Sequence, residues 1–100
     1  MTGRFHIEAE QGRLLLKLGS HFTTPDAERL DEAMRSLAPF SQLVVDFTDV
    51  RETQDSAFFL LSEALRRLAK VTVVLRGLTM HQSRLLRYLG LPVAEVRARA

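Results

Sequence analysis

The residues with the clearest chemical potential lie in one short stretch in the middle of the chain. Asp46 and Asp49 follow the apolar run 43–45, and Asp55 and Ser56 precede a long amphipathic segment. An apolar run of this kind is typical of a buried strand, so the two aspartates mark its exit into a loop. That loop delivers Ser56 to the first turn of the next helix, where backbone N–H groups are unpaired and the helix dipole is positive. A serine hydroxyl in this position either caps the helix or accepts a phosphate.

The two loop aspartates have two alternative roles. Asp46 and Asp49 could bind a divalent cation, or they could order the loop by accepting hydrogen bonds from backbone N–H groups. Two carboxylates alone make a poor magnesium site, so loop ordering is favoured. His6, His21 and His81 show no ligand spacing, and the chain has no cysteine. We therefore expect no metal site and no cofactor.

Other kinds of chemistry have weaker support. A catalytic triad can be drawn from Ser56, His21 and Asp46, but no nucleophile-elbow sequence accompanies it. The five glycines are too dispersed for a phosphate-binding loop, and one tyrosine with no tryptophan is a poor basis for nucleic-acid binding. We expect no enzymatic activity and no nucleic-acid partner, and a small hydrolase is the least favoured alternative.

Length and composition set the class of protein. The 100 residues are 46% hydrophobic and 26% charged, which predicts one soluble domain over residues 1–100. The first residues lack the apolar core of a signal peptide, and no apolar run approaches the roughly 20 residues of a membrane span. We expect a cytoplasmic protein with no direct membrane insertion.

Charge is distributed unevenly along the chain. Residues 1–50 carry a net charge of −3 and residues 51–100 carry +5. The arginines of the second half could face an acidic partner or a phosphate surface. The alternative is that they form the solvated outer faces of two helices and a tail.

The elements that position these residues begin with a hairpin. Residues 5–9 alternate with period two, Gln11 and Gly12 supply a tight turn in which Gly12 takes a positive φ, and residues 14–18 form the second strand. Further strands are expected at 43–47 and at 71–75, the last of them ended by Gly77. The tail after Pro92 either adds a short edge strand or frays.

Three helices are expected between these strands. The first begins at Thr24, which can cap it, has Pro25 at its first helical position and stops before Pro39. The second spans residues 56–70. The third runs from about Thr79 to Leu89, and Gly90 follows in a left-handed conformation. The spacing of apolar residues predicts these inward positions: Ala27, Leu30, Met34, Leu37, Phe58, Leu61, Leu65, Leu68, Leu85, Leu86 and Leu89.

Alternating strands and helices imply right-handed crossovers and parallel central strands. The fold class is therefore α/β, a mixed sheet made of the antiparallel N-terminal hairpin plus the parallel strands, with three or four helices. In such sheets the working surface lies at the carboxyl ends of the strands.

The order of these elements resembles the STAS domain, named for sulfate transporters and anti-sigma factor antagonists. The residues that carry the resemblance are 45–50, Asp55 with Ser56, residues 75–77 and residues 85–91, within about residues 5–96. The resemblance is to the stand-alone bacterial type. It implies a partner switch in signal transduction: a kinase that is also the anti-sigma factor phosphorylates the serine that follows the aspartate. Ser56 is then the candidate phosphoacceptor.

Two adjacent aromatic residues depart from the family pattern. Phe58 stands where the family commonly has glycine, and Phe59 points about 100° away from it on a helix. Either one of them is exposed as a partner contact or both fit a broad buried face. The expected partner-binding residues are Asp55, Phe58, Phe59 and Arg76, with Arg76 as the basic group that answers a phosphate on Ser56.

A second branch of the family is similar. There the domain is a small cytoplasmic subunit of a lipid-transporting ABC transporter, and the hydroxyl at the helix start serves an interface with the ATPase subunit. The expectation is therefore a non-enzymatic protein–protein interaction module, with a transporter subunit as the alternative function.

Overall fold

The computed structural model describes residues 5–68, 70–90 and 95–98 of the chain. These residues form seven strands and three helices, which follow one another in this order: β1 His6–Glu10, β2 Arg13–Lys17, β3 His21–Phe22, α1 Thr24–Ser36, β4 Gln42–Asp46, β5 Glu52–Thr53, α2 Asp55–Arg66, β6 Thr72–Leu78, α3 Met80–Tyr88 and β7 Glu95–Ala98.

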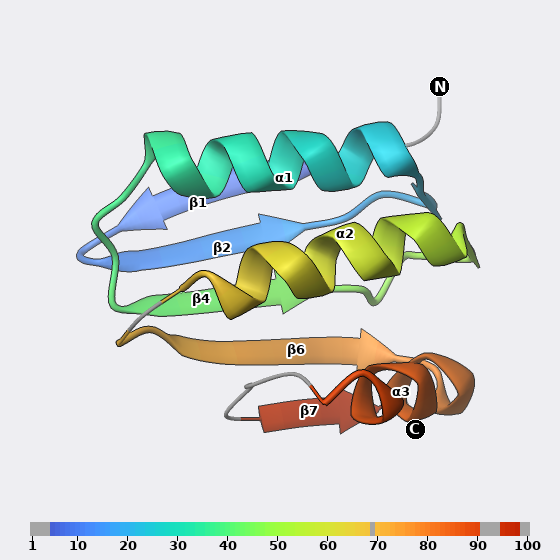
Figure 1. Cartoon of the computed structure of the whole chain (residues 1–100). Coiled ribbons are helices and arrows are strands. Elements are labelled where there is room, and N and C mark those ends of the chain that lie inside the picture. The colour runs from blue at the N-terminus through green and yellow to red at the C-terminus, as the bar shows by residue number, and fades with distance from the viewer. Residues whose placement is uncertain (1–4, 69, 91–94, 99–100) are drawn as a thin grey trace.

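The main sheet has five strands in the order β1-β2-β4-β6-β7. β1 and β2 pair antiparallel, and every other neighbouring pair is parallel. α1 and α2 lie side by side over one face of this sheet, and α3 lies at the edge formed by β7 (Figure 1). The predicted fold class is confirmed, and the tail supplies the edge strand that was one of its two expected outcomes.

The hairpin turn is where the sequence placed it. Gln11 and Gly12 have φ angles of 47° and 79°, and they join β1 to β2. A two-residue turn with positive φ at both positions matches the right-handed twist of the strands. Glycine adopts this backbone without the Cβ clash that other residues meet, and the prediction for Gly12 is confirmed.

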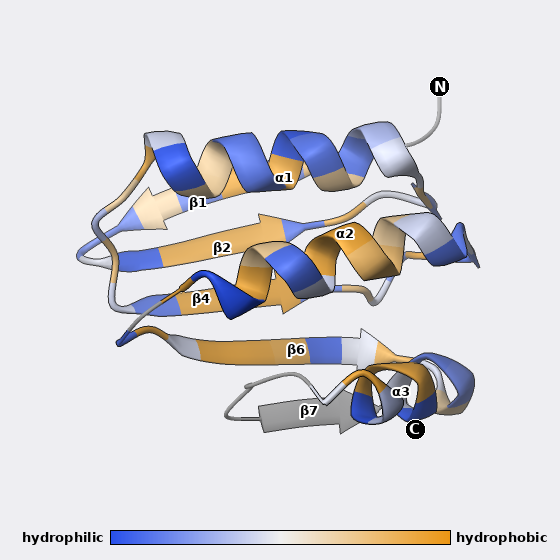
Figure 2. Cartoon of the chain, viewed as in Figure 1, coloured by the Kyte–Doolittle hydropathy of each residue, from blue (hydrophilic) through white to orange (hydrophobic). Residues whose placement is uncertain are grey.

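The core fills the space between the sheet and the two helices. Alternate residues of β2, β4 and β6 face it, and Figure 2 shows the apolar middle of these strands beneath α1 and α2. Ala27, Leu30 and Met34 of α1 and Phe58, Leu61 and Leu65 of α2 are buried as predicted. Three buried phenylalanines of this core pack against one another: Phe22 meets Phe47 and Phe58 edge-on, and Phe47 stacks on Phe58 with ring centroids 5.6 Å apart.

The start of α1 differs by one residue from the prediction. Thr23 is the N-cap: its side chain accepts a hydrogen bond from the Asp26 amide, and the Asp26 carboxylate accepts one from the Thr23 amide. This reciprocal arrangement is a capping box, and it leaves Thr24 as the first helical residue, with Pro25 after it. Thr24 was therefore wrong as the cap, and its hydroxyl is released for another contact.

α1 ends at Ser36, before Pro39 as predicted, but Leu37 is 41% exposed, so its predicted inward position was wrong. Two other boundaries were also wrong. α2 ends at Arg66, short of residue 70, and the chain turns through Lys70 with a φ of 59° before β6 begins. β6 continues past Gly77, whose φ of 76° accompanies a register shift against β7.

The third helix agrees with its prediction. Thr79 caps α3, and Gly90 follows it with a φ of 65°. Leu86 is buried, while Leu85 and Leu89 are half-buried. Pro92, expected to prevent the helix from continuing, lies outside the described residues.

Candidate functional site

The carboxyl ends of β2, β4 and β6 and the first turns of α1 and α2 lie at the same end of the molecule (Figure 1). β3 and β5 pair there as a separate two-stranded parallel sheet, which the sequence analysis missed. Both strands have only two residues, too few for a periodic pattern to reveal them. This small sheet brings the loop before α1 against the loop before α2.

Ser56 lies exposed in the first turn of α2, but it is not the N-cap. The N-cap is Gln54, and its side chain makes no capping hydrogen bond to α2. The Ser56 hydroxyl instead lies 2.6 Å from the Thr24 hydroxyl. Of the two sequence alternatives, capping is therefore excluded, and the serine makes a contact between two helices.

Gln54 connects the same two helix starts. Its Oε1 accepts hydrogen bonds from the Thr24 amide at 2.8 Å and from the Thr24 hydroxyl at 3.2 Å. The amide of Thr24 is one of the first N–H groups of α1, which have no partner within the helix. Gln54, the N-cap of α2, thus accepts a hydrogen bond from an otherwise unpaired N–H group of α1. Thr24, Gln54 and Ser56 form one hydrogen-bonded cluster at the surface.

The two phenylalanines of α2 point to opposite environments. Phe58 is 1% exposed and packs in the aromatic core, so it offers no surface to a partner, and the expectation that it binds one is corrected. Phe59 is 56% exposed. The departure from the family's glycine is accommodated inside the core, because the ring of Phe58 stacks on Phe47 rather than covering Ser56.

Asp46 is a buried acid whose carboxylate is held by several contacts. One of its carboxylate oxygens accepts hydrogen bonds from the amide of Thr48, at 2.9 Å, and from the Thr48 hydroxyl. Burial alone would raise the pKa of this carboxyl. The hydrogen bonds from Thr48 and the guanidinium of Arg76, 3.4 Å away, outweigh burial and hold the pKa of Asp46 below its ordinary value.

Arg76 and Asp49 lie apart from Ser56. Arg76 precedes Gly77 on β6 and follows the core residue Leu75, so the alternation of the strand directs Arg76 to the face opposite α1 and α2. There it pairs with Asp46. Asp49 is exposed and lies 3.6 Å from Lys17.

The triad drawn from the sequence is not assembled. Ser56 contacts Thr24, and Asp46 contacts Thr48 and Arg76. His21 makes other contacts: its Nδ1 lies 3.0 Å from the Ser20 hydroxyl, and its Nε2 lies 2.8 Å from Glu52. No local sequence pattern predicts the pairing of His21 with Glu52, because it depends on the alignment of β3 with β5. Among the residues described, no three His, Asp or Glu side chains gather as metal ligands.

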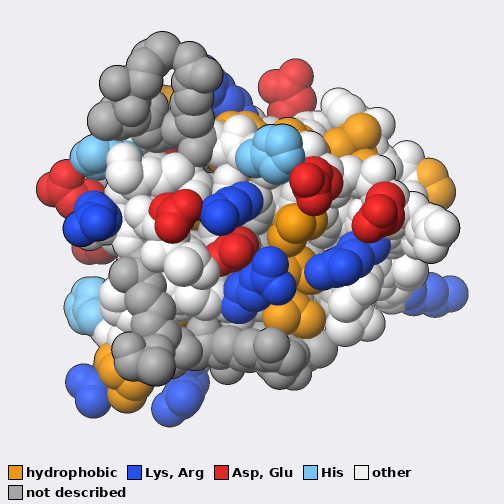
Figure 3. Space-filling view, turned by 180° about the vertical axis from the view of Figure 1, so that it is seen from behind, with side chains coloured by type: hydrophobic (Ala, Val, Ile, Leu, Met, Phe, Trp, Pro, Cys, Tyr) orange, Lys and Arg blue, Asp and Glu red, His pale blue; other side chains and the backbone are white. Residues whose placement is uncertain are grey.

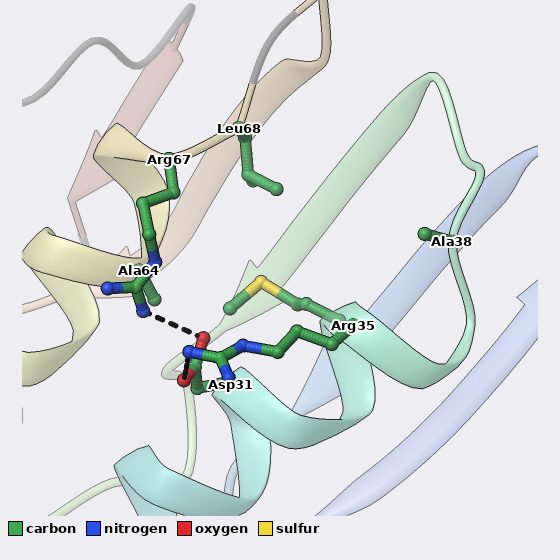
Figure 4. Close-up of a pocket in the computed structure, with 7 residues that line it drawn as sticks. Asp31, Arg35, Ala38, Ala64, Arg67 and Leu68 are labelled. Atoms are coloured by element: carbon green, nitrogen blue, oxygen red, sulfur yellow. Dashed lines mark hydrogen bonds and ion pairs between the residues drawn. The ribbon is translucent and has the colours of Figure 1, made fainter.

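A cavity of about 300 Å³ lies at the far end of the two helices. Asp31 of α1 pairs there with Arg35 of its own helix, at 2.8 Å, and with Arg67 after α2, at 3.0 Å (Figure 4). Arginine in the last turn of a helix suits the negative end of its dipole. These ion pairs tie α1 to α2, and Met34 and Ala64 supply part of the apolar lining.

The comparisons with known proteins assign the family. Residues 5–93 match the family model described as "Mlab, STAS domain". The chain belongs to the STAS domain family. No curated protein matches the chain. Within the part of the chain that the structure describes, every helix is too short or too polar to cross a lipid bilayer.

Membership in the STAS family bears on the residues at the start of α2. The serine that follows an aspartate at the start of a helix, on which the resemblance rested, is present as Ser56 after Asp55 and is accessible. Among the candidate residues, the structure brings Asp55, Ser56 and Phe59 together at the start of α2. It places Asp46 and Arg76 on the opposite face of the sheet.

Proposed function

We propose that this STAS domain is a non-enzymatic protein–protein interaction module that docks a partner on the start of α2 and releases it when Ser56 is phosphorylated. The observation that carries the proposal is the exposure of Ser56 and Phe59 on the same helix. Residues three apart on a helix are neighbours on its surface, so the hydroxyl and the aromatic ring present one continuous surface.

Phe59 supplies the affinity in this proposal. Phe59 is 56% exposed, so it stabilises the fold much less than the buried Phe58 does. A partner that covers Phe59 would remove its apolar surface from water, and this burial would favour binding. Aromatic anchors of this kind often dominate an interface, with polar contacts around them setting orientation. Asp55 and Ser56, one turn before Phe59, are the polar groups at its edge.

Ser56 supplies the control. A phosphate adds about −1.5 to −2 charges. The hydroxyl would give up its 2.6 Å contact with Thr24, and Asp55 would lie beside the new charge. Arg76, nominated from the sequence to answer this charge, is instead paired with Asp46 on the opposite face of the sheet. Arg76 therefore does not neutralise the phosphate in this proposal. A docked partner would have to desolvate the phosphate and would be repelled by it, so docking weakens.

The test is affinity capture with quantitative mass spectrometry, using the full chain as bait. Ser56→Asp and Phe59→Ala should each lower recovery of the same partner by about tenfold or more. Ser56→Ala should retain the partner. Matched controls are Ser36→Asp and Leu37→Ala, which change an exposed serine and an exposed apolar residue at the end of α1.

Stability should be nearly unchanged in the capture variants. An acidic residue suits the start of a helix, so Ser56→Asp should keep the melting temperature within a few degrees of the wild type. Ser56→Ala loses one exposed hydrogen bond, worth about 1 kcal/mol or less. A Ser56→Asp protein that captures the same partner as well as the wild type would refute the switch.

The hydrogen bond between Thr24 and Ser56 favours a second candidate function. A hydroxyl already held by the neighbouring helix suits a permanent interface, such as that of a small subunit on the ATPase of a lipid-transporting ABC transporter. In that case the captured partner is a transporter ATPase, and Ser56 carries no phosphate in the purified chain. An anti-sigma-type kinase that phosphorylates Ser56 would instead support the first candidate.

A further inference from the structure

The outer face of α3 has a composition unlike that of the other helix surfaces. Its exposed residues are Met80, His81, Arg84, Arg87 and Tyr88. Met80 is 60% exposed and Tyr88 is 87% exposed, so two of the four large apolar side chains exposed in the described structure lie on this nine-residue helix. The opposite side of α3 is anchored by the buried residues Gln82, Ser83 and Leu86.

These residue types are the ones that protein interfaces concentrate. Tyrosine, methionine and arginine are enriched at interfaces, whereas glutamate, serine and lysine are depleted. The exposed side of α1 also carries two arginines, but it has glutamate and serine in place of methionine and tyrosine: its residues are Pro25, Glu28, Arg29, Glu32, Arg35 and Ser36. Both helices are amphipathic, so packing on the sheet requires only their inner faces. The composition of the outer face of α3 is therefore not explained by folding.

The charge on this face has one sign. α3 contains no acidic residue, and no described carboxylate lies within 4.0 Å of the guanidinium of Arg84 or Arg87. Arg35 and Arg67 instead share Asp31, and Arg76 pairs with Asp46. Arg13 of β2 and Arg29 of α1 also lack a described carboxylate within 4.0 Å, but neither shares its element with an exposed large hydrophobic side chain. A partner that covers α3 must supply acidic groups, because two desolvated arginines without counterions would be costly.

We propose that the outer face of α3 is a second docking surface, which binds an acidic protein surface with Arg84 and Arg87 and covers Tyr88 and Met80. This second surface lies on α3, whereas the proposed Ser56 surface lies on α2. The inference therefore goes beyond the proposed function, because the domain would connect two partners. A symmetric pair of this chain through α3 would place like charges together. A membrane is disfavoured, because Met80 and Tyr88 lie about 12 Å apart along the helix and form no continuous apolar stripe.

The test is site-specific photocrosslinking in the cells that produce the protein. The photoreactive amino acid p-benzoylphenylalanine is placed at position 88 of the full chain, and the crosslinked peptides are sequenced by mass spectrometry. Position 37, also an exposed apolar site, is the background control, and position 59 reports on the Ser56 surface. We expect a crosslink from position 88 to an Asp/Glu-rich segment of another protein, at a yield several times that from position 37.

Charge variants connect the crosslink to the arginines. Arg84→Glu combined with Arg87→Glu should abolish the crosslink from position 88. Arg13→Glu combined with Arg29→Glu makes the same charge change on exposed residues of β2 and α1 and should leave it intact. Ser56→Asp should reduce only the crosslink from position 59, so the two proposals fail separately.

Three outcomes would overturn the second surface. The first is a yield at position 88 no higher than at position 37. The second is a crosslink to lipid, to a second copy of this chain, or to a protein segment without acidic residues. The third is a crosslink that persists when Arg84 and Arg87 are both reversed in a variant that melts like the wild type.

Discussion

The two faces of the five-stranded sheet differ in almost every physical respect. On the face under α1 and α2, alternate residues of β2, β4 and β6 are sealed from water, among them Leu16, Val45 and Leu75. On the other face, the strand register places His6, Lys17, Asp46 and Arg76 in one row across the sheet. Figure 3 shows that face, with charged groups of both signs around a short line of hydrophobic side chains.

The difference teaches where stability and specificity reside in this domain. Burial of apolar area under the helices drives folding. The Lys17–Asp49 ion pair of the open face is half-exposed, and such a pair contributes at most about 1 kcal/mol. The proposed docking surfaces lie on neither face of the sheet but on the outer sides of α2 and α3. Substitution of exposed residues there should change the free energy of unfolding little.

The largest effect should come from the helix-covered face. Leu16 and Leu15 are consecutive residues of β2 that point to opposite faces, one fully buried and the other half-buried. Leu16→Ala should destabilise by about 2–5 kcal/mol, through lost burial and a residual cavity. Leu15→Ala should cost about 1 kcal/mol. Equal shifts of the urea midpoint for the two variants would refute the contrast between the faces.

The next effect concerns Gly77, near the carboxyl end of β6. Gly77 has a positive φ, and a Cβ at this position would lie 2.5 Å from the backbone nitrogen of Thr48. Gly77→Ala should therefore cost about 2–4 kcal/mol, from backbone strain and overpacking together. Gly90→Ala is the matched control, because Gly90 also has a positive φ but has no atom within 4 Å of the added Cβ. Its expected cost is about 1 kcal/mol in the same urea titration.

A smaller effect is expected at the turn that joins β1 to β2. Gly12 has a φ of 79° and only an ordinary contact with Ser41. Gly12→Val should cost about 1–2 kcal/mol, since a β-branched residue resists this backbone, whereas Gly12→Asn should be tolerated better. If thermal melting ranks Val above Asn in stability, the backbone argument is wrong.

The smallest effect at neutral pH should come from the open face. Because the pKa of Asp46 is lowered in the folded protein from its ordinary 3.8, its ionisation stabilises the fold above that value. This contribution is lost as the pH falls through the folded pKa. Asp46→Asn should lower the urea midpoint modestly at pH 7, where this contribution is fully present, and should make the decline below pH 4 shallower. An unchanged acid slope would show that the Thr48 and Arg76 contacts do not act on this carboxyl.

Much of the fold could be predicted because its signals are local. The Gln11–Gly12 turn, the apolar strands and the inward face of α2 follow from turn chemistry and periodicity. Boundaries were less predictable: Thr23 replaces Thr24 as the cap because its capping box with Asp26 competes successfully with the neighbouring threonine.

By itself, the sequence determined the α/β architecture, the hairpin and the place of Ser56 in the first turn of α2, because each depends on neighbours close in the chain. Only the tertiary structure decided which phenylalanine is exposed, that Thr24 meets Ser56, and that Arg76 pairs with Asp46 on the opposite face. These outcomes join residues that are far apart in sequence or depend on the packing around α2. No local pattern reports how strands align across a sheet or how two helix starts meet on it.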